Sequence, residues 1–282
     1  MSFDLYLRGD KLQLAAILDH LDQHPGFQRQ QFSGPEFGCA YVNQATGVYY
    51  YLDIHEHHPN DGYVKSLGFS LNYNRPAFFA LETMPLVESL CRQFQLQVED
   101  PQEEFVGPAS LPDLINSWKI HNERAVKALK ANGTALNYMP ESKANEWWAY
   151  TRVREQLSQN FGDSVFVPEV FILKRPSEEP FRMIVCPEGT RQLLPAADVV
   201  CIDRSDEQAG TADLGFVSSE RFLDLVAPYT TEYHIGNESY LLLDPVSRPE
   251  VIEKTRQLEL TPLNTEHETV APDGFHNVVL AK

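Results

Sequence analysis

The stretch that decides the fold of the first part of the chain is VYYYLDIHEHHPNDGYVKSLGFSLNY, residues 48–73. Two β-rich runs, 48–57 and 64–73, flank the turn sequence Pro59-Asn60-Asp61-Gly62. Aromatic and β-branched residues favour strands, and a cluster of Pro, Asn, Asp and Gly favours a turn. The pattern therefore predicts two strands joined by a turn.

Further strands and two helices surround this stretch. Phe3–Leu7 alternates apolar and polar residues and predicts a strand, and Cys39–Asn43 predicts another. Asp10 with Gln13 three residues later is the pattern of a capping box, so we expect a helix to begin there. A second helix is expected over Pro76–Phe94. Together these elements predict a compact α+β unit over residues 1–107.

The second part of the chain opens with helices. Ser110 and Asp113 flank Pro112 as a helix start, and a second amphipathic run covers Glu141–Asn160. Strands and shorter helices are expected after it, and the last strand-like run is Phe275–Leu280. Helices and strands segregate along the chain, so we predict an α+β fold. It consists of two units, 1–107 and 108–282, each a mainly antiparallel sheet packed by helices, the second with a leading helical segment.

The chain is strongly acidic. Its 282 residues contain 40 Asp+Glu against 23 Lys+Arg, a formal net charge of −17. Residues 1–107 hold 14 acids and 6 bases, and residues 108–282 hold 26 and 17, so both parts are acidic. Such a body repels phosphate backbones and anionic lipids, which disfavours direct nucleic-acid or membrane binding and favours a basic partner. Charge that only keeps the protein soluble is an equally good interpretation.

The sequence predicts a cytoplasmic protein. No basic segment followed by an apolar run opens it, and no run of about 18 uncharged apolar residues occurs, so neither a signal peptide nor a membrane span is expected. The four cysteines are far apart in apolar surroundings. This spacing fits buried free thiols in a reducing compartment, not a disulfide framework or a metal knuckle.

Sequence signatures of catalysis are missing. Neither G-x-S-x-G nor the phosphate loops G-x-G-x-x-G and G-x-x-x-x-G-K-[ST] occur, so we expect no enzyme activity and no cofactor. The challenge to this expectation is a histidine cluster, in which His55 and His57 share a strand face shortly before Asp61. Two imidazoles with a carboxylate are able to bind a metal, so a metal-dependent hydrolase stays open as a hypothesis. A solvated strand end before a turn explains the same cluster.

Tyrosines with acidic neighbours are the expected binding residues. Tyr49 and Tyr51 point to one face of a strand and Tyr50 to the other, so packing on helices leaves tyrosine near Asp53 on the free face. Rigid aromatic surface beside charge is typical of protein interfaces, although tyrosine also simply favours strands. Loop acids complete the set, although solvation alone is the favoured explanation of them and partner contact the alternative. The candidate partner-binding residues are Tyr49, Tyr51, Asp53, Glu56, Asp61, Asp203, Asp206 and Glu207.

Two segments resemble bacterial immunity proteins. They are Ser2-Phe3-Asp4-Leu5-Tyr6-Leu7 and Gly68-Phe69-Ser70-Leu71-Asn72-Tyr73-Asn74-Arg75-Pro76, which runs into a Phe-rich helix. This half of the chain is similar to the immunity proteins that act against nuclease effectors of type VI secretion systems. The resemblance implies a non-enzymatic cytoplasmic protein that binds a secreted antibacterial toxin, encoded beside it, and blocks its active site.

The charge is consistent with that function. A nuclease toxin needs a basic surface to hold nucleic acid, and an acidic inhibitor is able to compete for the same surface. An acidic adaptor or regulatory module that binds some other protein is the alternative hypothesis.

Overall fold

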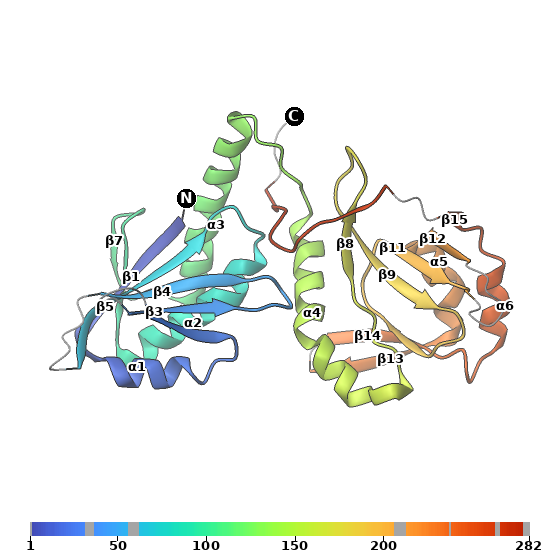
Figure 1. Cartoon of the computed structure of the whole chain (residues 1–282), viewed down its shortest axis with the longest axis horizontal. Helices are drawn as coiled ribbons and strands as arrows, with labels where there is room; N and C mark the ends of the chain where they lie inside the picture. The colour runs from blue at the N-terminus through green and yellow to red at the C-terminus, as the bar shows by residue number, and fades with distance from the viewer. Residues whose placement is uncertain are drawn as a thin grey trace. The chain divides into compact units, whose positions relative to one another are not determined.

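The chain folds into two compact units, which Figure 1 shows. The computed structural model describes residues 2–31, 37–55, 62–205, 213–236, 238–262 and 266–278. Unit 1 comprises residues 1–141 and 272–282, and unit 2 comprises residues 142–271. Both units combine helices with mainly antiparallel sheets, so the predicted α+β class is confirmed.

The boundary between the units differs from the one predicted at residue 107. Helix α3, Leu111–Ala131, belongs to unit 1, where it packs against α2, Phe78–Phe94. Its Trp118 is fully buried, and the Asn122 side chain donates a hydrogen bond of 2.9 Å to the carbonyl oxygen of Arg75. The apolar face of α3 thus completes the core of unit 1. Polar residues precede the helix in the sequence, and for this reason the unit boundary was predicted before α3.

Unit 1 is built on one antiparallel sheet of seven strands, in the order β2-β3-β4-β5-β1-β6-β7. The predicted strands are present, and three further strands extend the sheet at its two edges. The bounds are β1 Ser2–Gln13, β2 Phe27–Gln31, β3 Phe37–Val42, β4 Tyr49–His55, β5 Tyr63–Asn72, β6 Gln97–Asp100 and β7 Phe105–Gly107. Strands β2, β6 and β7 were not predicted, because β2 and β6 are short and rich in polar or acidic residues and β7 has only three residues.

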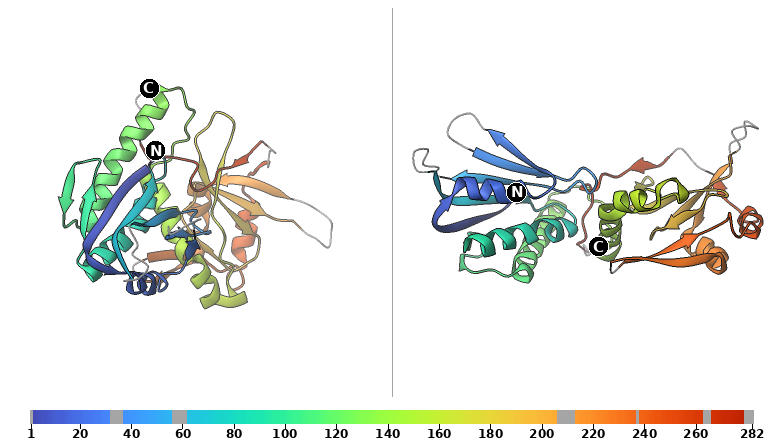
Figure 2. Two further views of the ribbon diagram at one scale, coloured as in Figure 1. Left: turned by 60° about the vertical axis from the view of Figure 1, so that its left-hand side comes forward. Right: turned by 90° about the horizontal axis from the view of Figure 1, so that it is seen from below.

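Helices cover one face of this sheet. The right-hand view of Figure 2 has α2 and α3 on one side of the strands. Strand β1 buries Phe3, Leu5 and Leu7 on that side, and β5 buries Phe69. These side chains and the apolar face of α2 form the core of unit 1.

The first helix begins later than predicted. Asp10 lies in β1, and α1 covers Leu14–Leu21 with Gln13 at its N-cap and no side-chain capping bond. The capping-box prediction at Asp10 is therefore wrong. The cause is pairing with β5, which holds Leu12 opposite Val64 after a β-bulge and so keeps the backbone extended. By contrast, the capping box predicted at the start of α3 forms.

The C-terminal segment returns to unit 1. Phe275 and His276 are buried, and His276 forms an isolated bridge with Tyr138 instead of the predicted strand, as far as residue 278. The Asn277 side chain accepts a hydrogen bond of 2.6 Å from the backbone N–H of Ala77 at the start of α2. Residues about 200 positions apart in sequence thus share one core.

Unit 2 divides its strands between two sheets. A six-stranded sheet has the order β15-β12-β11-β9-β8-β16, and a three-stranded sheet has the order β10-β14-β13. Only β9 and β11 pair in parallel among the described strands. The bounds are β8 Phe171–Lys174, β9 Phe181–Pro187, β10 Gln192–Leu194, β11 Val199–Asp203, β12 Leu214–Ser218, β13 Thr230–Ile235, β14 Glu238–Leu243, β15 Thr261–Pro262 and β16 Glu268–Thr269.

Three α-helices pack with these strands. They are α4 Glu141–Phe161, α5 Ser219–Val226 and α6 Glu250–Arg256. Helix α4 is attached by its aromatic side: Trp147 Nε1 donates a hydrogen bond of 2.9 Å to the carbonyl oxygen of Val170. The described sequence includes no helix long and apolar enough to cross a bilayer.

Candidate protein-binding face

Strand β4 presents two tyrosines on the face of the sheet that the helices leave free. Tyr50, Leu52 and Ile54 are buried, whereas Tyr51 keeps 44% of its surface exposed. Alternation along the strand places Tyr49 and Asp53 on the same side as Tyr51. The predicted division of the three tyrosines between the two faces is thus observed.

The neighbouring strands extend this surface, because the register aligns their outward residues. Tyr51 lies opposite Ser70 of β5, and Ser70 lies opposite Asp4 of β1. On the other side of β1, Tyr6 lies opposite Glu99 of β6. We name this surface the open face; it consists of Val42, Tyr49, Tyr51, Asp53, Ser70, Asp4, Tyr6, Arg8, Glu99 and Val106.

The open face carries more negative than positive charge. Its acids are Asp4, Asp53 and Glu99, against the single base Arg8. Arg8 forms an ion pair with Glu99 and lies 5.9 Å from the centre of the Tyr6 ring. The charges of these two side chains offset each other, and Asp4 and Asp53 are the other acids of the open face.

Hydrogen bonds fix the acid at the centre of the face. Asp4 accepts hydrogen bonds from the hydroxyl groups of Ser2 and Ser70, the former at 2.8 Å. Both donors are neutral, so they orient the carboxylate without cancelling its charge. The carboxylate of Asp4 is therefore held in place beside the tyrosines and is able to attract a cation.

The tyrosine pair is also held in place. The rings of Tyr49 and Tyr51 meet edge to face, with centroids 6.3 Å apart. The guanidinium of Arg75 lies 5.3 Å from the centre of the Tyr49 ring and donates a hydrogen bond to its hydroxyl group. Arg75 thus packs against Tyr49, and Tyr51 is the more exposed side chain of the pair. A rigid, half-exposed aromatic ring loses little entropy on binding.

The remaining predicted binding residues are Glu56, Asp61, Asp203, Asp206 and Glu207. Glu56, Asp61, Asp206 and Glu207 lie outside the described residues. Asp203 ends β11 in unit 2, where its carboxylate accepts a hydrogen bond of 2.9 Å from the backbone N–H of Ser205. That bond is typical of a loop turn.

The histidine cluster falls mostly outside the described residues as well. Strand β4 ends at His55, and residues 56–61, with His57, are not described. Within the ranges that are described, no group of three or more His, Cys, Asp or Glu residues is placed to hold a metal ion. The metal-dependent hydrolase stays a hypothesis that rests on sequence alone.

The four cysteines are buried free thiols, as predicted. Burial raises the pKa of Cys91 to about 11 and that of Cys201 to about 11. Burial also raises the pKa of Cys39 and of Cys186. Thiols of this kind are protonated at neutral pH and are poor nucleophiles.

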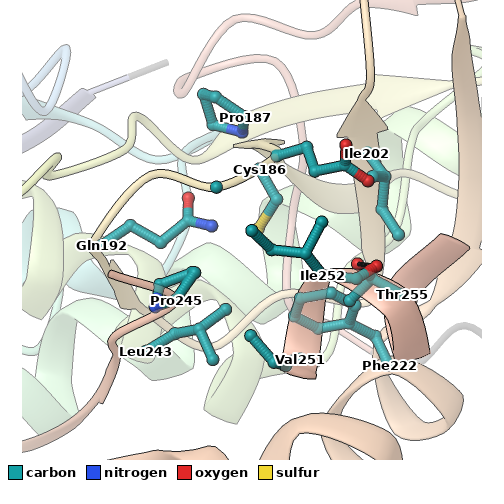
Figure 3. Close-up of a pocket in the computed structure, with 12 residues that line it drawn as sticks. Cys186, Pro187, Gln192, Ile202, Phe222, Leu243, Pro245, Val251, Ile252 and Thr255 are labelled. Atoms are coloured by element: carbon teal, nitrogen blue, oxygen red, sulfur yellow. Dashed lines mark hydrogen bonds between the residues drawn. The ribbon is translucent and has the colours of Figure 1, made fainter. Parts of the chain in front are cut away.

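A cavity in unit 2 is too small for a substrate. Figure 3 shows Cys186, Gln192 and Phe222 among the side chains that line it, together with Thr255 of α6. Its volume is about 20 Å³, which is room for one water molecule. This site offers no place for chemistry on a ligand.

Sequence reasoning missed the part of the open face that β1, β6 and β7 supply. The alternation in Phe3–Leu7 already places Asp4 and Tyr6 on one side of a strand. What the pattern cannot indicate is that β5 brings β1 beside β4, since that order depends on pairing between distant segments. Val106 was not predicted as part of the surface, because the strand that contains it, β7, was not predicted.

Comparison with known proteins finds no match. No protein family model matches the chain, and no curated protein and no solved structure is significantly similar to it.

Proposed function

We propose that this chain is a non-enzymatic immunity protein that binds a secreted antibacterial toxin through the open face and blocks its activity in the cytoplasm. The partner is a basic protein, and a nuclease fits best. The observation that carries the proposal is the exposed Tyr51 ring among the carboxylates of Asp4 and Asp53. The resemblance of the Ser2–Leu7 and Gly68–Pro76 segments to immunity proteins supports it independently.

The chemistry of the face suits a toxin that handles nucleic acid. Tyrosine supplies rigid contact area, and buried aromatic anchors dominate the binding energy of protein interfaces. The net charge of −17 attracts a basic partner at long range. A surface that binds phosphates must present Lys and Arg, so an acidic face is complementary to it.

The experiment compares two aromatic substitutions in cells and in solution. Tyr51→Ala removes the proposed anchor, and Phe166→Ala is the matched control, because Phe166 is an aromatic residue of unit 2 with 39% exposure against 44% for Tyr51. Each variant is co-expressed with the toxin encoded by the adjacent gene. Survival of the host and the dissociation constant of the purified pair are measured.

We expect Tyr51→Ala to weaken binding by about 30-fold, the effect of a typical hot spot of about 2 kcal/mol, and to reduce survival. Phe166→Ala should change the affinity less than about threefold, and both variants should keep the melting temperature within about 2 °C of the parent. If the unaltered chain neither binds the toxin nor protects the host, the immunity function is refuted. Equal losses of toxin affinity in the two variants would contradict the assignment of the open face as the binding surface.

A further inference from the structure

The last strand of the sheet in unit 1 has an unprotected edge. Strand β7 ends the strand order beside β6, and no further strand pairs with it in the described ranges. Phe105 and Val106 are 42% and 62% exposed, although both are large and apolar. Proteins usually protect edge strands with charged residues or proline, and β7 contains neither.

A groove runs beside this edge on the helical side of the sheet. It has a volume of about 490 Å³, which lies within the range of ligand-binding pockets. Leu5 and Val98 of the sheet and Leu114 of α3 give it an apolar lining. Phe105 forms its rim, where the ring closes over Gly107: a Cβ on Gly107 would lie 3.2 Å from that ring.

The groove also carries negative charge. Asp100, Glu103 and Asp113 line it, and no Lys or Arg does. Asp100 is 5% exposed and accepts hydrogen bonds of 2.9 Å from the Ser117 hydroxyl and from the backbone N–H of Gln102. These donors are neutral, so they leave the negative charge of Asp100 in place.

The other two carboxylates differ in their partners. Asp113 is held by the capping box with Ser110, which is also neutral. Glu103 forms an ion pair of 3.1 Å with Arg124 and lies 2.9 Å from His121 Nε2. The groove therefore presents two carboxylates, those of Asp100 and Asp113, that its own neighbours do not neutralise.

We propose that an extended, basic segment of the protein partner adds to β7 as an eighth strand. Its backbone pairs with the free edge, one apolar side chain enters the groove toward Leu5 and Leu114, and a Lys or Arg reaches Asp100. A segment is favoured over a small cation because backbone pairing and an alternate side-chain pocket are the two elements of strand addition. The inference rests on the proposed function, because it assigns a second contact to the same partner.

Synthetic peptides test this inference without the toxin. The probe alternates lysine and valine, and its affinity for the full chain is measured together with the amide chemical shifts of β6 and β7. Two control peptides alternate glutamate with valine, or keep the lysines but carry proline at every second valine. We expect binding by the first peptide alone, with shifts centred on Val106. Equal binding of the proline peptide, binding of the acidic peptide, no binding at all, or shifts confined to other strands would each overturn the inference.

Three substitutions locate the contact. Val106→Lys places a charge on the edge, and Ala109→Trp fills the groove that Ala109 lines. Val246→Lys is the matched control, since Val246 is 74% exposed and lies in unit 2. The first two should weaken peptide binding at least about tenfold, a loss of one interface anchor, and Val246→Lys should change it less than about twofold. Unchanged binding by both Val106→Lys and Ala109→Trp, each verified as folded by its spectrum, would contradict the inference.

The toxin separates this inference from the proposed function. If Tyr51→Ala abolishes toxin binding and Val106→Lys leaves it unchanged, the strand addition is wrong and the immunity function stands. If the peptide binds as expected and the toxin does not bind, the groove is real and the immunity function is wrong.

Discussion

The side chain of Asn277 links the C-terminal segment to the rest of unit 1 through two hydrogen bonds. Its Oδ1 accepts the hydrogen bond of 2.6 Å from the N–H of Ala77, and its Nδ2 donates a hydrogen bond of 2.7 Å to the carbonyl oxygen of Met139. Ala77 and Met139 are 5% and 0% exposed. In Asn277→Ala both backbone groups lose their partner in buried surroundings. We therefore expect unit 1 to lose about 2–3 kcal/mol of its free energy of unfolding.

Thermal and urea unfolding of the full chain measure this loss. For a unit of this size, the expected destabilisation lowers the melting temperature by about 5–10 °C. Asn116→Ala is the control, because Asn116 is exposed on α3 of the same unit, and it should change the stability by less than about 0.5 kcal/mol. A loss below about 0.5 kcal/mol for Asn277→Ala would refute the reasoning, since the buried backbone groups of Ala77 and Met139 would then not depend on the Asn277 side chain.

Three further predictions follow from buried charge, buried thiols and net charge. Burial alone would raise the pKa of Asp198, but hydrogen bonds from Lys143 and Arg182 outweigh it and hold that pKa below its usual value. Asp198→Ala should therefore lower the free energy of unfolding, measured with urea at neutral pH, by about 3 kcal/mol. This difference between the variant and the unaltered protein should shrink only below about pH 4, where the carboxyl of the unaltered protein becomes protonated. A difference that does not depend on pH would contradict this prediction. Because burial raises the pKa of Cys91 and of Cys201 to about 11, a thiol reagent at pH 8 should label the native chain far more slowly than the denatured chain. Equal labelling rates in stopped-flow absorbance would contradict the burial. The association rate with the toxin should fall clearly as the salt concentration is raised, because the Debye length falls to about 8 Å at physiological ionic strength. An association rate that does not change with salt would contradict electrostatic steering.

Local patterns predicted the elements whose chemistry is strong within a few residues. The alternation in Val48–Asp53 indicated which tyrosines share a face, and the Ser110 start signal indicated where α3 begins. In both cases nearest neighbours in the chain decide the geometry, either through the two-residue period of a strand or through the capping bond. These predictions needed no knowledge of the rest of the fold.

Long-range pairing decided the features that sequence reasoning missed. Strand β1 continues past Asp10 because β5 pairs with it, so a local helix signal yields to sheet formation. Strand β2 is polar, and it exists because β3 supplies its partner. Asn277 belongs to unit 1 through contacts with residues that lie 138 and 200 positions away, which no local window contains.

The predicted part of the candidate site likewise depends on local pattern, and the part that was missed depends on long-range pairing. Tyr49, Tyr51 and Asp53 were found from one strand, and they lie on one face of it. The contributions of Asp4 and Glu99 depend on the strand order, which places β5 and β1 between β4 and β6. Candidate residues from a single strand can therefore be read from the sequence, whereas the extent of the surface cannot.

Hydroxyl-radical footprinting of the complex with the toxin tests the central claim most directly. Tyr51 and Phe166 are similarly exposed aromatic side chains in the free protein, at 44% and 39%, so each reports on its own unit under identical conditions. We predict that the toxin protects Tyr51 from oxidation and leaves Phe166 as reactive as before. Protection of Phe166 with Tyr51 unchanged would contradict the assignment of the open face as the surface that binds the toxin.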